Sequence, residues 1–125
     1  MRRVLAASVI LIAAGCTGGG AAATSASVEL YEPVIAPSAD TFSTGEVSLA
    51  VTNTGRFAHT LVVTTDSGRV ITATELIQSG ESVDLVVDLA PGTYQFTCRI
   101  VAQMDDGSLL DHYEAGMNTM VTVTG

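Results

Sequence analysis

Hydrophobic and polar residues alternate with a period of two along most of the chain from residue 28 onward. Apolar side chains at every second position are typical of β-strands that bury one face. The segments with this pattern are 28–31, 47–52, 59–63, 83–88, 93–100 and 121–124. Turn sequences with glycine, such as Asp66-Ser67-Gly68 and Pro91-Gly92, separate them. No long helical pattern is present, so the chain is predicted to be an all-β sandwich or barrel.

The phase of the alternation also predicts where two reactive side chains point. Cys98 is in phase with Tyr94 and Phe96, and His59 is in phase with Leu61 and Val63. Because the side chains of a strand alternate between its two faces, Cys98 and His59 are both expected to face the core.

The first 27 residues have a different character. Arg2 and Arg3 precede an apolar run of eleven residues, 4–14, which is too short to span a bilayer, for which about 20 are needed, but fits a signal peptide. The run ends in Ala13-Ala14-Gly15-Cys16, which resembles a bacterial lipobox. We therefore expect a signal peptide at 1–15, a Cys16 that carries acyl chains such as palmitate, a flexible tether at 16–27 and one domain at 28–125. A signal peptide with an incidental cysteine is the alternative.

Charge limits the partners of the exported chain. Without Arg2 and Arg3, three arginines stand against thirteen acidic residues, which gives a net charge of −10, and there is no lysine. This balance argues against a nucleic-acid partner.

From the signal peptide and the lipobox we expect a monomer that is lipid-anchored to the cell membrane and faces outward or into the periplasm.

The remaining cysteine and the two histidines carry the candidate chemistry. If Cys16 is lipidated, Cys98 has no disulfide partner in the chain. A lone cysteine in an exported protein suggests an intermolecular bridge, a reactive thiol, a metal ligand or an inert core residue. His112 and Met117 lie close together further along, and His59 follows an Asn-Thr-Gly turn at residue 53.

Three segments resemble the plastocyanin-like blue copper proteins, the cupredoxins. Residues 53–60 resemble their N-x-G-x-x-x-H segment, and residues 91–98 resemble their P-G-x-Y-x-F-x-C strand. Residues 112–117 resemble their H-x-x-x-G-M ending, with a final strand at 121–123. The resemblance covers about residues 28–123.

The resemblance implies a Greek-key antiparallel β-sandwich with one type 1 copper ion bound by His59, Cys98, His112 and Met117. A thiolate, two imidazoles and a weak axial thioether are what a blue copper site requires. The family also implies an exposed edge of His112 as the exit for electrons. The chain departs from the family in one respect, since the thirteen residues between Cys98 and His112 are more than is usual, and Asp106-Gly107 among them favours a hairpin turn.

Several functions remain open from the sequence. The first is a membrane-tethered electron carrier that acts with a redox protein, and the second is a carrier or store of Cu(I), favoured by Met104 and Met120 near the other soft ligands. A metal-free interaction module is the third, and zinc held with Asp111 is a further reading of the ligand cluster. An enzyme is not expected, because two histidines cannot build the second copper centre of a copper oxidase.

Overall fold

A computed structural model describes residues 22–125, so the predicted signal peptide, Cys16 and the first part of the tether lie outside the described residues. Regular structure in this part of the chain is entirely β. No helix within residues 22–125 is long and apolar enough to cross a membrane. The strands are β1 (Ser25–Tyr31), β2 (Val34–Pro37), β3 (Thr41–Ser43), β4 (Gly45–Asn53), β5 (Val62–Thr65), β6 (Val70–Ala73), β7 (Ser82–Leu89), β8 (Gly92–Thr97), β9 (Val101–Gln103), β10 (Leu109–Asp111) and β11 (Asn118–Thr124).

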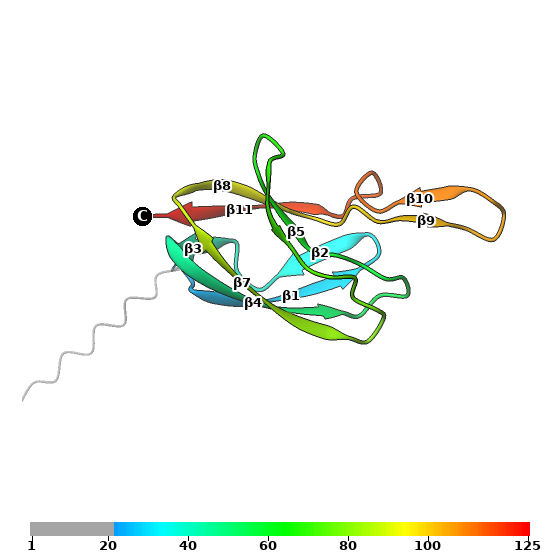
Figure 1. Cartoon of the computed structure of the whole chain (residues 1–125), viewed down its shortest axis with the longest axis horizontal. Coiled ribbons are helices and arrows are strands. Elements are labelled where there is room, and N and C mark those ends of the chain that lie inside the picture. The colour runs from blue at the N-terminus through cyan, green and yellow to red at the C-terminus, as the bar shows by residue number, and fades with distance from the viewer. Residues whose placement is uncertain (1–21) are drawn as a thin grey trace, which may run out of the picture.

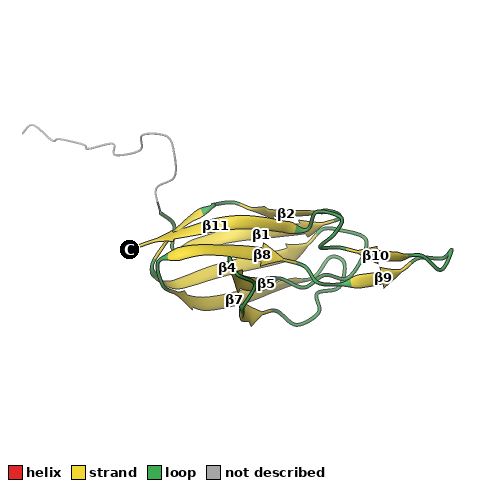
Figure 2. Ribbon diagram, turned by 90° about the horizontal axis from the view of Figure 1, so that it is seen from above, coloured by secondary structure: helices red, strands yellow, loops and turns green. Residues whose placement is uncertain are grey.

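The strands form two facing sheets and a separate hairpin (Figures 1 and 2). One sheet has the order β2-β1-β4-β7, the other has the order β3-β11-β8-β5-β6, and β9 pairs only with β10. Most neighbours are antiparallel, but β1 runs parallel to β4 and β3 runs parallel to β11, so both sheets are mixed. The predicted all-β sandwich is confirmed, with these two parallel pairs added to the antiparallel arrangement.

The alternating residues build the core as their spacing predicts. In β4, Val47, Leu49 and Val51 are buried while the residues between them face outward. Phe42 and Phe96 come from two strands of the facing sheet, and their ring centroids lie 6.3 Å apart. Each fully buried side chain of this size contributes about 1.5–3 kcal/mol through removal of apolar surface from water.

Several features of the strands were not predicted. β1 begins at Ser25 rather than at Val28, because Ser25–Ser27 already pair with Ser48–Ala50 of β4. The edge strands β3 and β6 are short, and β6 buries neither face completely. Alternation needs one buried face, so short and half-exposed edge strands leave little trace in a sequence.

The sandwich has two ends of different character. Strands β1, β4 and β8 all finish at the same end, from which the β9–β10 hairpin extends beyond both sheets (Figure 1). The start of β1 and the C-terminus of the chain lie at the opposite end (Figure 1). The loops that carry His59, Cys98 and His112 therefore meet at the end that bears the hairpin.

Candidate metal site

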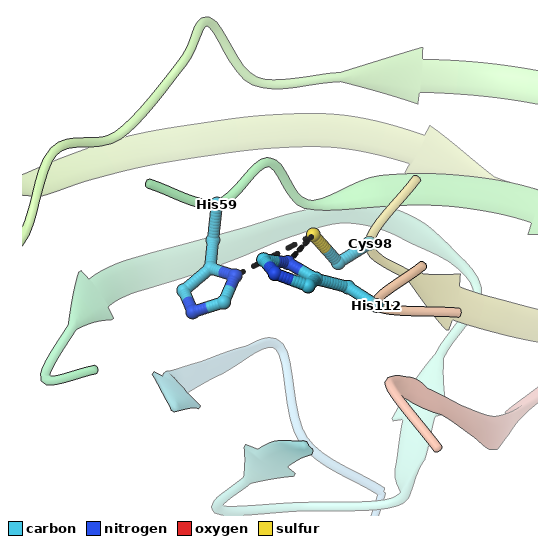
Figure 3. Close-up of side chains that lie close together, drawn as sticks. All are labelled: His59, Cys98 and His112. Carbon is cyan, nitrogen blue, oxygen red and sulfur yellow. Dashed lines mark hydrogen bonds between the residues drawn. The ribbon is translucent and has the colours of Figure 1, made fainter. Parts of the chain in front are cut away.

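Cys98 and the two histidines form one buried cluster (Figure 3). The Sγ atom of Cys98 lies 3.6 Å from Nδ1 of His59 and 3.7 Å from Nδ1 of His112. The three donor atoms all lie within 4.8 Å of one another, and all three residues are buried. Metal–nitrogen and metal–sulfur bonds of about 2.0–2.3 Å place the ligands of one ion about 3.5 Å apart, so this spacing suits a single ion.

A tight loop brings Met117 to the same place. The backbone N–H of Met117 donates to the carbonyl of His112 at 2.9 Å, and the N–H of Cys98 donates to the carbonyl of Met117 at 3.1 Å. Gly116 has a φ of +124°, a conformation that glycine adopts without strain. Met117 is fully buried. Backbone hydrogen bonds therefore tie Cys98, His112 and Met117 into one unit.

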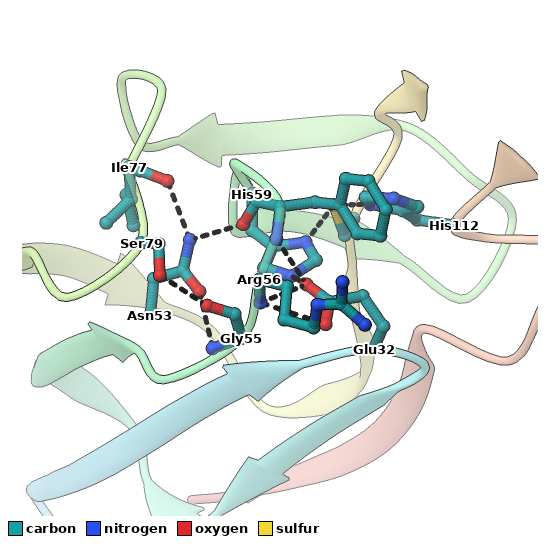
Figure 4. A network of polar contacts seen from close by, with 10 residues as sticks. Glu32, Asn53, Gly55, Arg56, His59, Ile77, Ser79 and His112 are labelled. Carbon is teal, nitrogen blue, oxygen red and sulfur yellow. Dashed lines mark hydrogen bonds and ion pairs between the residues drawn. The ribbon is translucent and has the colours of Figure 1, made fainter. Parts of the chain in front are cut away.

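His59 is held by a buried asparagine (Figure 4). The Asn53 side chain donates to the carbonyls of Phe57 and Ile77, each at 2.8 Å, and accepts from the N–H of Gly55 at 2.9 Å. His59 and Ile77 exchange backbone hydrogen bonds of 3.0 and 2.8 Å. His59 thus lies just before β5 rather than within a strand, and it faces the core as its phase predicts.

Glu32 is a part of the site that sequence reasoning missed. It follows β1, and its Oε1 atom lies 2.6 Å from Nε2 of His59 (Figure 4). The backbone N–H groups of Arg56 and Phe57 also donate to this carboxylate. Burial raises the pKa of Glu32, but these hydrogen bonds outweigh that effect and lower the pKa to about 2. Glu32 is therefore ionised at neutral pH, and nothing in its spacing from His59 reveals the contact.

His112 is enclosed instead of exposed. The residue is 1% exposed, and its ring centroid lies 4.8 Å from that of His59 and 5.8 Å from that of Phe57. Burial lowers the pKa of His112, and the nearby His59 lowers it further, which favours the neutral form that binds metals. The expected exposed edge of His112 is thus wrong, because the imidazole is buried against Phe57 and His59.

Two aromatic residues, Phe57 and Tyr113, lie next to the cluster in different ways. Phe57 packs against the ring of His112. Tyr113 instead lies beneath the guanidinium of Arg99, whose Cζ atom is 3.9 Å from the ring centroid. Exclusion of water at His112 therefore involves Phe57, whereas Tyr113 packs with Arg99 beside the hairpin.

The donors suit one metal better than others. His59, Cys98 and His112, with Met117, form a type 1 copper ligand set: one sulfur that binds as thiolate, two imidazoles and a thioether. The nitrogen donors are both Nδ1, which leaves Nε2 of His59 for Glu32. Asp111, the extra ligand of the zinc reading, does not belong to the described cluster of metal-binding groups.

Comparisons with known proteins bear on the fold. No protein-family model matches the sequence, and no curated protein matches it. Among solved structures, auracyanin from Roseiflexus castenholzii is 22% identical and covers 84% of this chain and 100% of its own, with a TM-score of 0.62. An azurin from Methylomonas sp. strain J is 14% identical over 83% of this chain and 100% of its own, with a TM-score of 0.61. The chain has the cupredoxin fold.

A third structure with this fold is auracyanin A from Chloroflexus aurantiacus, described as a "blue" copper protein. It is 13% identical over 80% of this chain and 99% of its own, with a TM-score of 0.56.

The long segment between Cys98 and His112 forms the β9–β10 hairpin, and Gly107 turns it at a φ of +85°. The hairpin turn predicted at Asp106-Gly107 is confirmed. At the base of the hairpin, the N–H of His112 donates to the carbonyl of Ile100 at 3.0 Å, so the insertion leaves the ligands together.

Proposed function

We propose that the chain binds one copper ion through His59, Cys98, His112 and Met117 and carries single electrons between proteins, tethered to the membrane through a lipid on Cys16. The observation that carries the proposal is the buried cluster in which Cys98 Sγ lies 3.6 and 3.7 Å from two imidazole nitrogens. Bound copper would supply a one-electron couple between Cu(II) and Cu(I). Auracyanin A, which has this fold and is described as a "blue" copper protein, supports copper as the metal.

The polypeptide around the cluster suits electron transfer because it is pre-formed. Backbone hydrogen bonds join Cys98 to Met117, Met117 to His112 and His59 to Ile77. Ligands held in this way have little freedom to rearrange when the charge of a bound ion changes. The burial of all three cluster residues also excludes water. These properties favour a carrier that holds its metal over one that delivers it.

The arrangement of the methionines favours the electron carrier over the Cu(I) carrier or store. Met104 and Met120 are 36% and 46% exposed, whereas Met117 is fully buried. Met104 belongs to the hairpin, and Met120 lies on the outward face of β11. The soft ligands that suggested Cu(I) storage are therefore not gathered at the buried site.

We expect the purified full-length chain, loaded with Cu(II), to cycle reversibly between two oxidation states without loss of metal. Voltammetry gives the reversibility, and a competing Cu(I) chelator added to the reduced protein measures retention. Retention of copper in both states supports an electron carrier. Rapid loss of Cu(I) to the chelator would contradict it and favour the copper carrier, and no copper binding at all would leave the metal-free module.

The hairpin offers a contact surface for the redox partner. On β9 and β10, Val101 is 52% exposed and Leu109 is 71% exposed. In the hairpin register these residues lie on one face, with the acidic Asp111 opposite Val101 and exposed Asp105 and Asp106 at the turn. An apolar surface beside like charges fits a partner with an apolar patch and a cationic rim. Such a partner would dock directly over the segment that joins Cys98 to His112.

A matched pair of substitutions tests this surface. We expect Val101→Ser to weaken electron exchange with a basic haem protein about fivefold. The partner would bury the methyl groups of Val101 on docking, and loss of that apolar contact costs about 1 kcal/mol. Val86→Ser is the control, since Val86 is 55% exposed on β7, in the sheet that contributes no ligand. Stopped-flow rates against protein concentration provide the measurement. Equal rates for the two variants would place docking elsewhere.

A further inference from the structure

The two imidazoles of the cluster have unequal surroundings. Nε2 of His59 lies 2.6 Å from a carboxylate oxygen of Glu32. Nε2 of His112 is buried and has no hydrogen-bond partner among the described residues. Only one of the two candidate ligands is therefore in contact with a negative charge. The proposal that follows rests on the proposed copper site.

The carboxylate of Glu32 is fixed in place by three groups. Its Oε1 atom accepts from the N–H of Phe57 at 2.8 Å, and both of its oxygens lie 3.0 Å from the N–H of Arg56. Gly55 packs directly against it, since a Cβ atom at this position would overlap the carboxylate. The side chain of Glu32 is only 19% exposed, so solvent screens its charge poorly.

The hydrogen-bond pattern determines how His59 presents its ring. An ionised carboxylate can only accept hydrogen bonds, so Nε2 of His59 must carry the hydrogen that points to Glu32. In a neutral imidazole, Nδ1 then keeps its lone pair, and this is the atom that faces Cys98. A carboxylate behind a ligating histidine fixes its tautomer and makes the ligand more basic.

We propose that Glu32 is a positioning residue that sets His59 in the metal-binding tautomer and stabilises Cu(II) over Cu(I) through its fixed negative charge. The physical reason is that a nearby anion favours the more positive ion, and a carboxylate–imidazole hydrogen bond strengthens as the ring becomes more positive. Glu32 therefore lowers the reduction potential of the site.

The β1–β2 turn then links the fold to the redox property of the site. Glu32 lies in this turn and contacts the loop of His59, while the carbonyl of the next residue, Pro33, lies 3.4 Å from where a Cβ on Gly116 would be. The same turn thus packs against the loop that carries Met117. The N–H groups of Thr54 and Gly55 donate to Leu30 at the end of β1, which fixes the turn relative to the first ligand.

Substitution of Glu32 gives the first test. We expect Glu32→Gln to shift the Cu(I):Cu(II) ratio at a fixed ambient potential about tenfold toward Cu(I), which is about 59 mV for one electron. Gly55→Ala should act in the same direction, because the added methyl group displaces the carboxylate while the charge stays in the protein. Gly55 does not have a positive φ, so alanine is compatible with its backbone.

The matched control is Glu81→Gln, which removes an exposed carboxylate that bonds only to the backbone of Gln78 in the described structure. Its potential should equal that of the wild-type protein. If Glu32→Gln changes the ratio no more than Glu81→Gln does, the charge of Glu32 does not set the potential, and the proposal is overturned.

Nitrogen NMR of the copper-free, full-length protein gives a readout that does not depend on metal loading. We expect the His59 ring as the Nε2–H tautomer in the wild-type protein and a mixture of tautomers in Glu32→Ala. An Nδ1–H ring in the wild-type protein would overturn the proposed role. If the wild-type protein binds no copper, the proposed function fails. If it binds copper and Glu32→Gln leaves the reduction potential unchanged, only this inference fails.

Discussion

Replacement of Cys98 by serine is expected to abolish the intense visible absorption of the copper-loaded protein. A thiolate bound to Cu(II) gives a strong charge-transfer band and narrow copper hyperfine splitting, whereas a serine hydroxyl gives neither. Cys98 is fully buried between two imidazoles, and serine is nearly the same size, so the fold should persist. Absorption and electron spin resonance spectra of both proteins after addition of Cu(II) provide the measurement.

Met120→Leu is the control for the cysteine variant. Met120 is 46% exposed and lies on β11 close in sequence to the site, so its loss should leave the band unchanged. A band that survives in Cys98→Ser would mean that copper binds outside the described cluster. A colourless wild-type protein that binds zinc through the same cysteine would instead support the zinc reading.

The second large effect is expected from Asn53→Ala. The Asn53 side chain is fully buried and makes three hydrogen bonds, to Gly55, Phe57 and Ile77. Alanine leaves the carbonyl of Phe57 without this donor and opens a small void. Since each buried polar group left unpaired costs about 1–3 kcal/mol, the free energy of unfolding should fall by about 2–4 kcal/mol. Denaturant unfolding of the copper-free protein measures it.

Asn118→Ala makes the same chemical change at an exposed position. The Asn118 amide donates one long bond of 3.4 Å to the carbonyl of Tyr113, so its removal should change stability by less than about 0.5 kcal/mol. The Asn53 network also holds the loop that leads to His59. Equal stability of the two variants would mean that solvent replaces the Asn53 bonds and that the loop does not depend on them.

Residues with a strong periodic or motif signal were predictable. Alternation identified β4 and β7 and placed Cys98 and His59 on core-facing positions, because the period of a strand follows directly from which face is buried. The ligand cluster was predicted from the resemblance of three separated segments to the cupredoxins. The order of these segments along the chain was enough to predict the ligands, because each ligand lies at a strand end or in a short loop next to one.

Contacts between distant segments were not predictable in the same way. Glu32 is 27 residues before His59, and it reaches the ring only because β1 and β4 run parallel and finish at the same end of the sandwich. The burial of His112 depends on Phe57, which comes from another loop. Short edge strands such as β3 lack a full period of alternation. In each case the missing information is tertiary and not local.

The position of the C-terminus has a practical consequence. The C-terminus and the start of β1 lie at one end of the sandwich, and the β9–β10 hairpin extends from the other (Figure 1). A protein immobilised on an electrode through its C-terminus would hold its metal-binding end toward the solution, a sandwich length from the conducting surface. Attachment through a residue of the β9–β10 hairpin would reverse that orientation.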